Sequence, residues 1–157
     1  CREFGRTVIP VLEDEYIDAG TVSLEYRHLA ILGEESVNAA AASECAADQD
    51  LFWPYHDLLV GETERTYKEH ARTLQATAAG AALNLETFDA CVDAGTHVAA
   101  VQAATVTAWS TLSGSGTARI AVPLFLVNDG FWRVGIPTMD ELRAEITRLQ
   151  PASASSE

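Results

Sequence analysis

A predicted β-hairpin near the carboxyl end of the chain constrains the fold more than any other stretch. Residues 120–127 form an apolar run rich in β-branched and aromatic side chains, long enough for one buried strand. The Asn-Asp-Gly sequence at 128–130 tolerates the positive φ angles of tight turns, and residues 131–134 supply a returning strand. The chain therefore has to build at least part of a β-sheet.

Pro123 lies inside this apolar run, and proline has no backbone N–H to donate in a central strand. In one interpretation, Pro123 is the first residue of the strand, where the missing donor costs nothing. In the other, Val122–Pro123 is a cis peptide bond in a functional loop, because cis-proline is rare and usually retained for a reason. The proline by itself leaves both interpretations open.

Composition indicates one globular domain of ordinary size. The chain has 157 residues, of which 48% are hydrophobic and 21% charged. Its net charge of −13 argues against a nucleic-acid partner, whose phosphates it would repel. No apolar run is long enough to cross a bilayer, so we expect no membrane-spanning segment in this chain. Because residue 1 is Cys and not Met, we expect the true beginning, with any targeting segment, to lie upstream.

The cysteines and histidines are scattered along the sequence. Cys1, Cys45 and Cys91 lack the paired Cys-x-x-Cys spacing of metal sites, and the four histidines make no helical His-x3-His pair. We therefore expect neither a metal site nor a bound cofactor.

The remaining sequence is mainly helical. Residues 2–18 have one apolar face and should kink at Pro10, and residues 21–28 alternate like a half-buried strand. Further helices are predicted at 34–47, 51–60, 66–83, 84–95 and 96–112, and a last one follows a capping box formed by Thr138 and Glu141. This order of helix, strand, helical block, hairpin and helix predicts an α/β or α+β sandwich with a large helical insertion.

Several local motifs occur in a defined order along the chain. Cys-Arg-Glu-Phe at 1–4 and Ile-Pro at 9–10 come first, and Val-Pro-Leu-Phe at 122–125 comes last. Between them are Phe52-Trp53, His56-Asp57-Leu58-Leu59, and Leu83-Asn84-Leu85 followed by Phe88 and Cys91. In this order the motifs resemble those of the DsbA-like disulfide oxidoreductases of the thioredoxin fold, with the middle group matching the family's helical insertion. The resemblance covers essentially residues 1–149.

The resemblance implies a single thioredoxin-like domain at 1–150, with the helical insertion at about 34–112 and a disordered tail at 151–157. It aligns Cys1 with the second cysteine of the family's Cys-x-x-Cys motif. The nucleophilic cysteine and the central first strand of the sheet would then lie upstream of residue 1. We therefore expect this chain to lack the first strand of the fold, unless a neighbouring molecule supplies one.

The same resemblance implies a thiol–disulfide oxidoreductase that acts on unfolded or secreted polypeptides, either as a dithiol oxidase or as an isomerase. It also implies an extracytoplasmic location (periplasmic, cell-surface or secreted) and a membrane redox partner for reoxidation. Two alternatives remain open. One is a non-catalytic thioredoxin-fold domain that binds peptides, and the other is a protein like the kappa-class glutathione transferases or isomerases.

Residue roles follow from the resemblance and from thiol chemistry. Cys1 is the predicted catalytic residue, because a helix N-terminus favours the thiolate form. The alternative for Cys1 is a buried, inert thiol. Opposite such a cysteine we expect the Val122–Pro123 bond to be cis and to present backbone groups to an extended substrate. Some members of the family carry a non-catalytic disulfide, which implies a structural Cys45–Cys91 bond. The alternative for these two cysteines is that each is a small core residue.

Overall fold

The structure, a computed structural model, describes residues 1–61, 66–77, 83–114, 121–128 and 130–150. The chain divides into two compact units, which we describe separately. The first comprises Cys1, Glu3–Ser23 and Ala121–Glu157, and the second comprises Arg2 and Leu24–Ile120. No helix among the described residues is long and apolar enough to cross a membrane.

The first unit opens with a helical segment interrupted near Pro10. Helix α1 (Arg2–Thr7) is followed by α2 (Ile9–Leu12) and by a π-helical turn, η1 (Glu13–Ile17). Pro10 is in the first turn of α2 and has no N–H to donate, so the α-helix restarts there instead of continuing. The α-helix is thus interrupted at Val8, close to the predicted kink, whereas the π-helical turn has no signal in the sequence.

A glycine ends this helical segment, as the sequence predicts. Gly20 has a φ of +71°, in the left-handed region that glycine enters without steric cost. The Thr21 N–H then donates to the Tyr16 carbonyl, which closes the helix end. The chain leaves the helix at this point.

The predicted hairpin is present in the first unit. Strand β1 (Leu124–Val127) pairs antiparallel with β2 (Gly130–Val134), with an irregular register between Phe125 and Leu126. Asn128 has a φ of +49°, as the turn signal predicts, while residues 120 and 129 lie outside the described residues. Strand β1 begins one residue after Pro123, so the proline does not interrupt the ladder.

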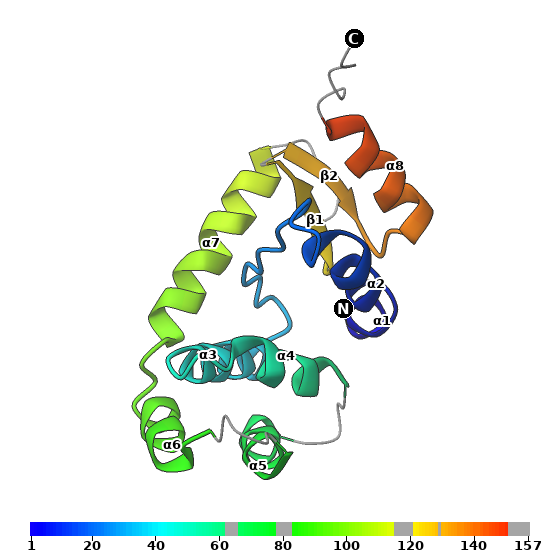
Figure 1. Ribbon diagram of the computed structural model, residues 1–157. Coiled ribbons are helices and arrows are strands. Elements are labelled where there is room, and N and C mark those ends of the chain that lie inside the picture. The colour runs from blue at the N-terminus through cyan, green and yellow to red at the C-terminus, as the bar shows by residue number, and fades with distance from the viewer. Residues whose placement is uncertain (62–65, 78–82, 115–120, 129, 151–157) are drawn as a thin grey trace. The chain divides into compact units, whose positions relative to one another are not determined.

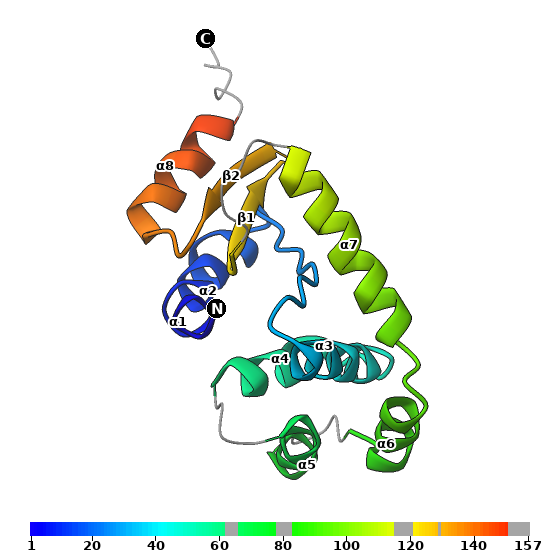
Figure 2. The ribbon, with the colours of Figure 1, turned by 180° about the vertical axis from the view of Figure 1, so that it is seen from behind.

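Helix α8 (Met139–Leu149) completes this unit. It begins with the predicted capping box, in which the Thr138 side chain accepts from the Glu141 N–H and the Glu141 side chain accepts from the Thr138 N–H. The helix lies beside β2 in both views (Figures 1 and 2). Two ion pairs tie it to its neighbours: Arg133 of β2 with Glu141, and Glu15 of η1 with Arg143.

The strand predicted at 21–28 is not formed. Val22 and Leu24 are half-buried while Ser23 and Glu25 are exposed, as the alternation predicts, but Tyr26, which it places on the same inner face, is exposed. A β-strand also needs a hydrogen-bonded partner, and in the described sheet β1 and β2 pair only with each other. The sequence pattern indicates the burial of residues 22–25 but not which backbone is available for pairing.

The second unit is a helical cluster arranged around one central helix. Its helices are α3 (Glu34–Ala47), α4 (Phe52–Gly61), α5 (Tyr67–Thr77), α6 (Leu85–Asp93) and α7 (Val98–Gly114). Helix α3 contacts each of the other four, and Figure 1 shows α3 and α4 side by side above α5 and α6. Buried side chains of α3 to α6 and their connections form the core: Ala42, Cys45, Ala46, Leu51, Tyr55, Ala71, Leu83 and Phe88.

The predicted helices match this unit closely, because each has a strong periodic pattern and a defined end. The main difference is at the end of α5, which is predicted at residue 83 and lies at Thr77 in the structure. Residues 78–82 of the predicted continuation lie outside the described residues. The predicted tail at 151–157 also lies outside it. All of the predicted insertion at about 34–112 falls in the second unit. The single-domain organisation stays a prediction.

Candidate active site

Cys1 is the residue that caps the start of α1. Its carbonyl accepts a hydrogen bond from the Gly5 N–H at 2.9 Å, which fixes the first turn of the helix. Its side chain makes no capping hydrogen bond, and Cys1 is an exposed free cysteine. The sulfur is therefore open to a reaction partner at the amino end of a helix.

An aromatic contact joins the start of α1 to β1. The rings of Phe4 and Phe125 are 4.4 Å apart between centroids and tilted by 57°, and Phe4 is 92% buried, with only 8% of its surface exposed. Phe125 follows two residues after Pro123, whose bond to Val122 is cis, as expected. The structure thus brings the helix that starts at Cys1 and the segment after Val122–Pro123 together in one unit.

Val122 has backbone groups that are available for a further strand. Among the described residues, none is hydrogen-bonded to the Val122 N–H or C=O. The neighbouring Pro123 carbonyl is occupied, because it accepts from the Gly135 N–H at 2.9 Å. This bond holds Pro123 against the end of the hairpin.

Two charged side chains of α8, Glu141 and Arg143, form ion pairs with β2 and with η1. The hydrogen bond from the Arg143 guanidinium lowers the pKa of Glu15. Arg133, helped by the backbone and side chain of Thr138, lowers the pKa of Glu141 to about 2. Both carboxylates are therefore ionised at neutral pH, and they link α8 to η1 and to β2.

The other two cysteines lie in the second unit. Cys45, in the last turn of α3, is bonded to Cys91 of α6, with the two Cα atoms 5.9 Å apart. Cys45 is only 2% exposed. The structure contains the bond that the resemblance implied, and its place at a helix–helix junction suits a crosslink.

Sequence reasoning missed a cluster of aromatic and histidine rings in the second unit. Tyr26 lies 5.0 to 6.5 Å, centroid to centroid, from His28, Phe52, Trp53 and His56. A hollow of about 180 Å³ lies beside it, lined in part by Tyr26, His28 and His56. The alternation of residues 21–28 does place Tyr26 and His28 on one side, but no local signal connects them to a helix that starts at residue 52.

His28 and Tyr26 also interact with the same carboxylate, that of Glu44. The His28 Nε2 atom is 2.6 Å from the Glu44 Oε1 atom. Burial raises the pKa of the Tyr26 hydroxyl, and the charge of Glu44 raises it further. The cluster therefore combines a neutral phenol with a histidine–carboxylate pair.

Comparison with known proteins shows which protein family this sequence matches. A family model described as thioredoxin matches residues 1–146. Two curated relatives, each named probable disulfide bond formation protein D, are similar over 71 residues: the Bacillus anthracis protein at 37% identity and the Bacillus cereus protein at 35%. That stretch covers 44% of this chain and 33% of either relative, so the match spans about a third of their length.

The fold has a counterpart among solved structures. The crystal structure of Chlamydia trachomatis DsbA superposes with a TM-score of 0.75 at 21% sequence identity, covering 95% of this chain and 77% of the other. This likeness shows a thioredoxin-like fold with a helical insertion. Since the family model covers nearly the whole sequence as well, the chain belongs to the thioredoxin family and has the DsbA-like form of its fold.

Proposed function

We propose that the protein is a thiol–disulfide oxidoreductase that acts on the cysteines of unfolded or secreted polypeptides. The observation that carries this proposal is the exposed thiol of Cys1 at the start of α1, linked through Phe4 and Phe125 to the segment that follows Val122–Pro123. The names of the two curated relatives, which refer to disulfide bond formation, support the same chemistry.

The resemblance aligns Cys1 with the second cysteine of the Cys-x-x-Cys motif, whose thiolate attacks a mixed disulfide to resolve it. The step that we assign to Cys1 is this same chemistry, an attack by its thiolate on one sulfur of a disulfide. A new bond forms between Cys1 and that sulfur, the old bond breaks, and the second sulfur leaves as a thiolate. The unpaired backbone N–H groups at the start of α1 and the adjacent positive charge of Arg2 favour the thiolate of Cys1. The sulfur is therefore both accessible and stabilised in its reactive form.

The substrate is an extended polypeptide that pairs with the Val122 backbone. Backbone pairing supplies affinity without requiring a particular sequence, which suits an enzyme with many substrates. Such substrates are unfolded chains outside the cytoplasm, where disulfides persist. We accordingly place the protein in an extracytoplasmic compartment, with a membrane redox partner that reoxidises it.

Complete turnover, as a dithiol oxidase or an isomerase, needs a second thiol besides Cys1. The other two cysteines of this chain are bonded to each other, so they do not supply it. The half-reaction that forms a mixed disulfide requires Cys1 alone. It is therefore the step to test on this chain.

The test is the rate at which the chain reacts with an aromatic disulfide that releases a coloured thiolate. We expect one thiolate released per chain, and a rate for the folded chain severalfold above that of the denatured chain at the same pH. Cys1→Ser should abolish the release. A folded chain that reacts no faster than the denatured chain would contradict the proposal, and peptide binding without this reactivity would favour a non-catalytic peptide-binding domain.

The substrate-binding role is tested separately with two disulfides of different size. Val122→Pro removes the N–H that would pair with a substrate, and Val122→Ala retains it. We expect Val122→Pro to slow reaction with an extended peptide disulfide several times more than reaction with a small disulfide. Equal slowing of both reactions in a variant with unchanged far-UV circular dichroism would exclude this role for Val122.

A further inference from the structure

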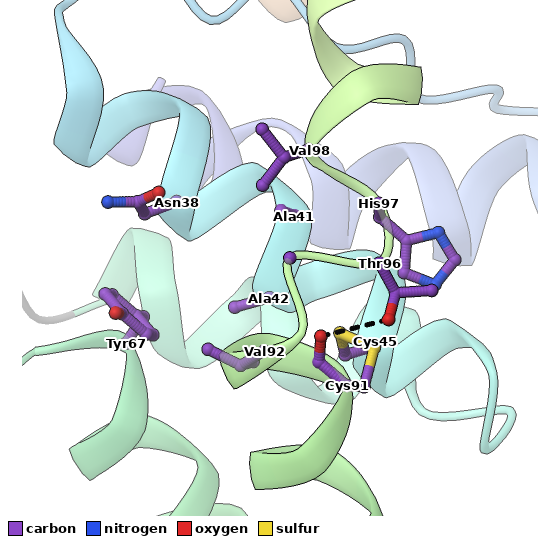
Figure 3. A pocket seen from close by; sticks show the side chains of 11 residues that line it. Asn38, Ala41, Ala42, Cys45, Tyr67, Cys91, Val92, Thr96, His97 and Val98 are labelled. Atoms are coloured by element: carbon purple, nitrogen blue, oxygen red, sulfur yellow. Dashed lines mark hydrogen bonds between the residues drawn. A yellow bond between two sulfur atoms is a disulfide. The ribbon is translucent and has the colours of Figure 1, made fainter.

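Two sulfur atoms and an imidazole come together where α3, α6 and the start of α7 meet. The ligand atoms of Cys45, Cys91 and His97 all lie within 4.8 Å of one another. Figure 3 shows the disulfide, with His97 next to it on the connection between α6 and α7. Cys91 and His97 are close in the sequence, but Cys45 lies 46 residues before Cys91, so motif spacing gave no sign of the cluster.

The connection that carries His97 is fixed by bonds that do not involve the disulfide. The Thr96 N–H and the Thr96 hydroxyl both donate to the Cys91 carbonyl, at 3.2 and 3.1 Å. Gly95 enters the left-handed region, with a φ of +62°, and its N–H donates to the Val92 carbonyl. His97 is therefore held beside Cys91 by backbone geometry that should survive reduction of the disulfide.

We propose that reduction of the Cys45–Cys91 disulfide converts this cluster into a Zn²⁺ site. A dithiol reductant gives two electrons and two protons to the disulfide and itself becomes a disulfide, leaving two thiols. As the two Zn–S bonds form, both thiols release their protons to solvent, and one nitrogen of His97 binds as the third ligand. This inference does not depend on the activity proposed for Cys1.

The spacing of the cluster fits this metal. Two thiolates bound to tetrahedral Zn²⁺ at about 2.3 Å lie about 3.8 Å from each other, so the freed sulfurs need only a short separation. A cavity of about 30 Å³ beside the disulfide offers room for a water as the fourth ligand. Thiolate and imidazole ligands select Zn²⁺ over Ca²⁺ or Mg²⁺.

Asp48 acts as a positioning residue for the imidazole. Its Oδ2 atom is 2.7 Å from His97 Nε2 and 3.9 Å from Cys91 Sγ. A carboxylate that accepts from one ring nitrogen fixes the tautomer and leaves the other nitrogen for the metal. The cluster therefore already contains the outer carboxylate that accompanies metal-binding histidines.

The test uses the 157-residue chain with Cys1→Ser, so that the exposed thiol cannot bind metal. The protein is reduced with a phosphine, desalted without oxygen and titrated with Co²⁺, a spectroscopic substitute for Zn²⁺. We expect one equivalent to bind, with sulfur-to-cobalt charge-transfer absorption and the visible bands of tetrahedral Co²⁺, both lost when Zn²⁺ is added. The oxidised chain should show neither signal.

Matched variants separate the proposed ligands from nonspecific binding. His97→Ala should weaken binding at least tenfold, and Asp48→Asn should weaken it roughly 10- to 100-fold while the tetrahedral spectrum is kept. Asp93→Asn, which changes a carboxylate of α6 paired with Lys68, should leave the affinity unchanged. If reduction unfolds the helices, Zn²⁺ should restore the far-UV circular dichroism. The proposal would be overturned if the reduced chain failed to bind one equivalent, or if His97→Ala or the oxidised chain bound equally well. It would also be overturned if a chain unfolded by reduction did not recover its helix with Zn²⁺.

Discussion

The two units of the molecule use cysteine in opposite ways. In the first unit, Cys1 is exposed and free at the start of a helix. In the second unit, Cys45 is buried and bonded to Cys91, and it belongs to the main hydrophobic core. We therefore expect the exposed thiol at the helix end to react with disulfides, and the bonded pair at the helix junction to remain unreactive unless it is reduced.

The two units also differ in what stabilises them. The second unit has a core of buried aliphatic and aromatic side chains with a covalent link across it. The first unit has a two-stranded hairpin and short helical segments, an aromatic contact between Phe4 and Phe125, and ion pairs to α8. Its buried apolar side chains are fewer and come mainly from the first helical segment: Phe4, Val8, Ile9, Leu12 and Leu142. A two-stranded hairpin is marginal in isolation, so the first unit depends on this apolar surface more than on its exposed ion pairs.

Among these changes, removing the Cys45–Cys91 disulfide should have the largest effect on the free energy of unfolding. The Cys45–Cys91 bond closes a loop with a sequence separation of 46 residues. The chain-entropy model gives about 4 kcal/mol for such a loop, so Cys45→Ala combined with Cys91→Ala should lower the free energy of unfolding by about that amount. Urea unfolding of the oxidised chain and the double variant measures the difference.

Two controls accompany this variant. Thiol titration of the denatured, unreduced chain should find one free thiol, that of Cys1, and a count of three would show that the bond is absent. Reaction of Cys1 with the aromatic disulfide should remain as in the unchanged chain. A loss of Cys1 reactivity would contradict the division of roles between the two units.

Loss of the contact between Phe4 and Phe125 in the first unit should have the second-largest effect on stability. Phe4→Ala removes a buried ring that packs against Phe125, and comparable truncations of buried phenylalanine cost about 3 kcal/mol. Because Phe4 anchors the turn after Cys1 to β1, we also expect the reaction rate of Cys1 to fall. Urea unfolding and the coloured-thiolate assay measure the two effects.

Phe4→Leu is the matched control, since it retains most of the apolar surface and should cost less in both assays. A Phe4→Ala variant with lower stability but unchanged Cys1 reactivity would show that this contact stabilises the unit without positioning the thiol.

The sequence predicted elements that depend on local patterns and missed those that depend on distant partners. The helix at 34–47, the hairpin turn at 128–130 and the capping box at Thr138 follow from periodicity, turn residues and caps, all of which act within a few residues. The strand at 21–28 was wrong because pairing requires a second strand that no local pattern supplies. The approach of His97 to Cys45 was missed because tertiary packing alone brings them together.

The residues of the candidate active site show the same difference between local and distant features. Cys1 and Pro123 are recognisable from the sequence, because a cysteine before a helix and a proline in an apolar run are local features. Their placement in one unit rests on the contact between Phe4 and Phe125. That contact joins residues more than a hundred positions apart, so only the fold reveals it.

A buried hydroxyl in the second unit should have a smaller effect than the Phe4 ring. The Tyr55 hydroxyl donates to the Tyr67 carbonyl at 2.7 Å inside the core, and burial raises the pKa of Tyr55. Tyr55→Phe keeps the ring contact with Phe88 but leaves this carbonyl without its donor, which should cost about 1 to 2 kcal/mol. Tyr67→Phe keeps the backbone acceptor, so urea unfolding should show a smaller loss, and equal losses would argue against this bond.

The smallest expected effect is an acid sensitivity confined to the first unit. The pKa of Glu141 is lowered to about 2 from an ordinary value of 4.5, chiefly by Arg133 and then by Thr138. A lowered folded pKa means that this carboxylate contributes stability above about pH 4.5, and the contribution is lost as the pH falls toward 2. Glu141 is exposed, so the effect should be small and should weaken in high salt.

Hydrogen exchange of the amides of α8 is the measurement that isolates this effect from the rest of the molecule. Between pH 6 and pH 3, protection of these amides, corrected for intrinsic exchange, should fall in the unchanged chain. In Glu141→Gln it should be lower at pH 6 and should vary less with pH, because the variant has no carboxylate to protonate at this position. Glu25→Gln is the control from the second unit, where Arg27 lowers the pKa of Glu25, and it should leave the protection of α8 unaltered. A pH profile of Glu141→Gln parallel to that of the unchanged chain would mean that Glu141 does not link α8 to β2 in solution, and the hairpin would then rely on its apolar contacts alone.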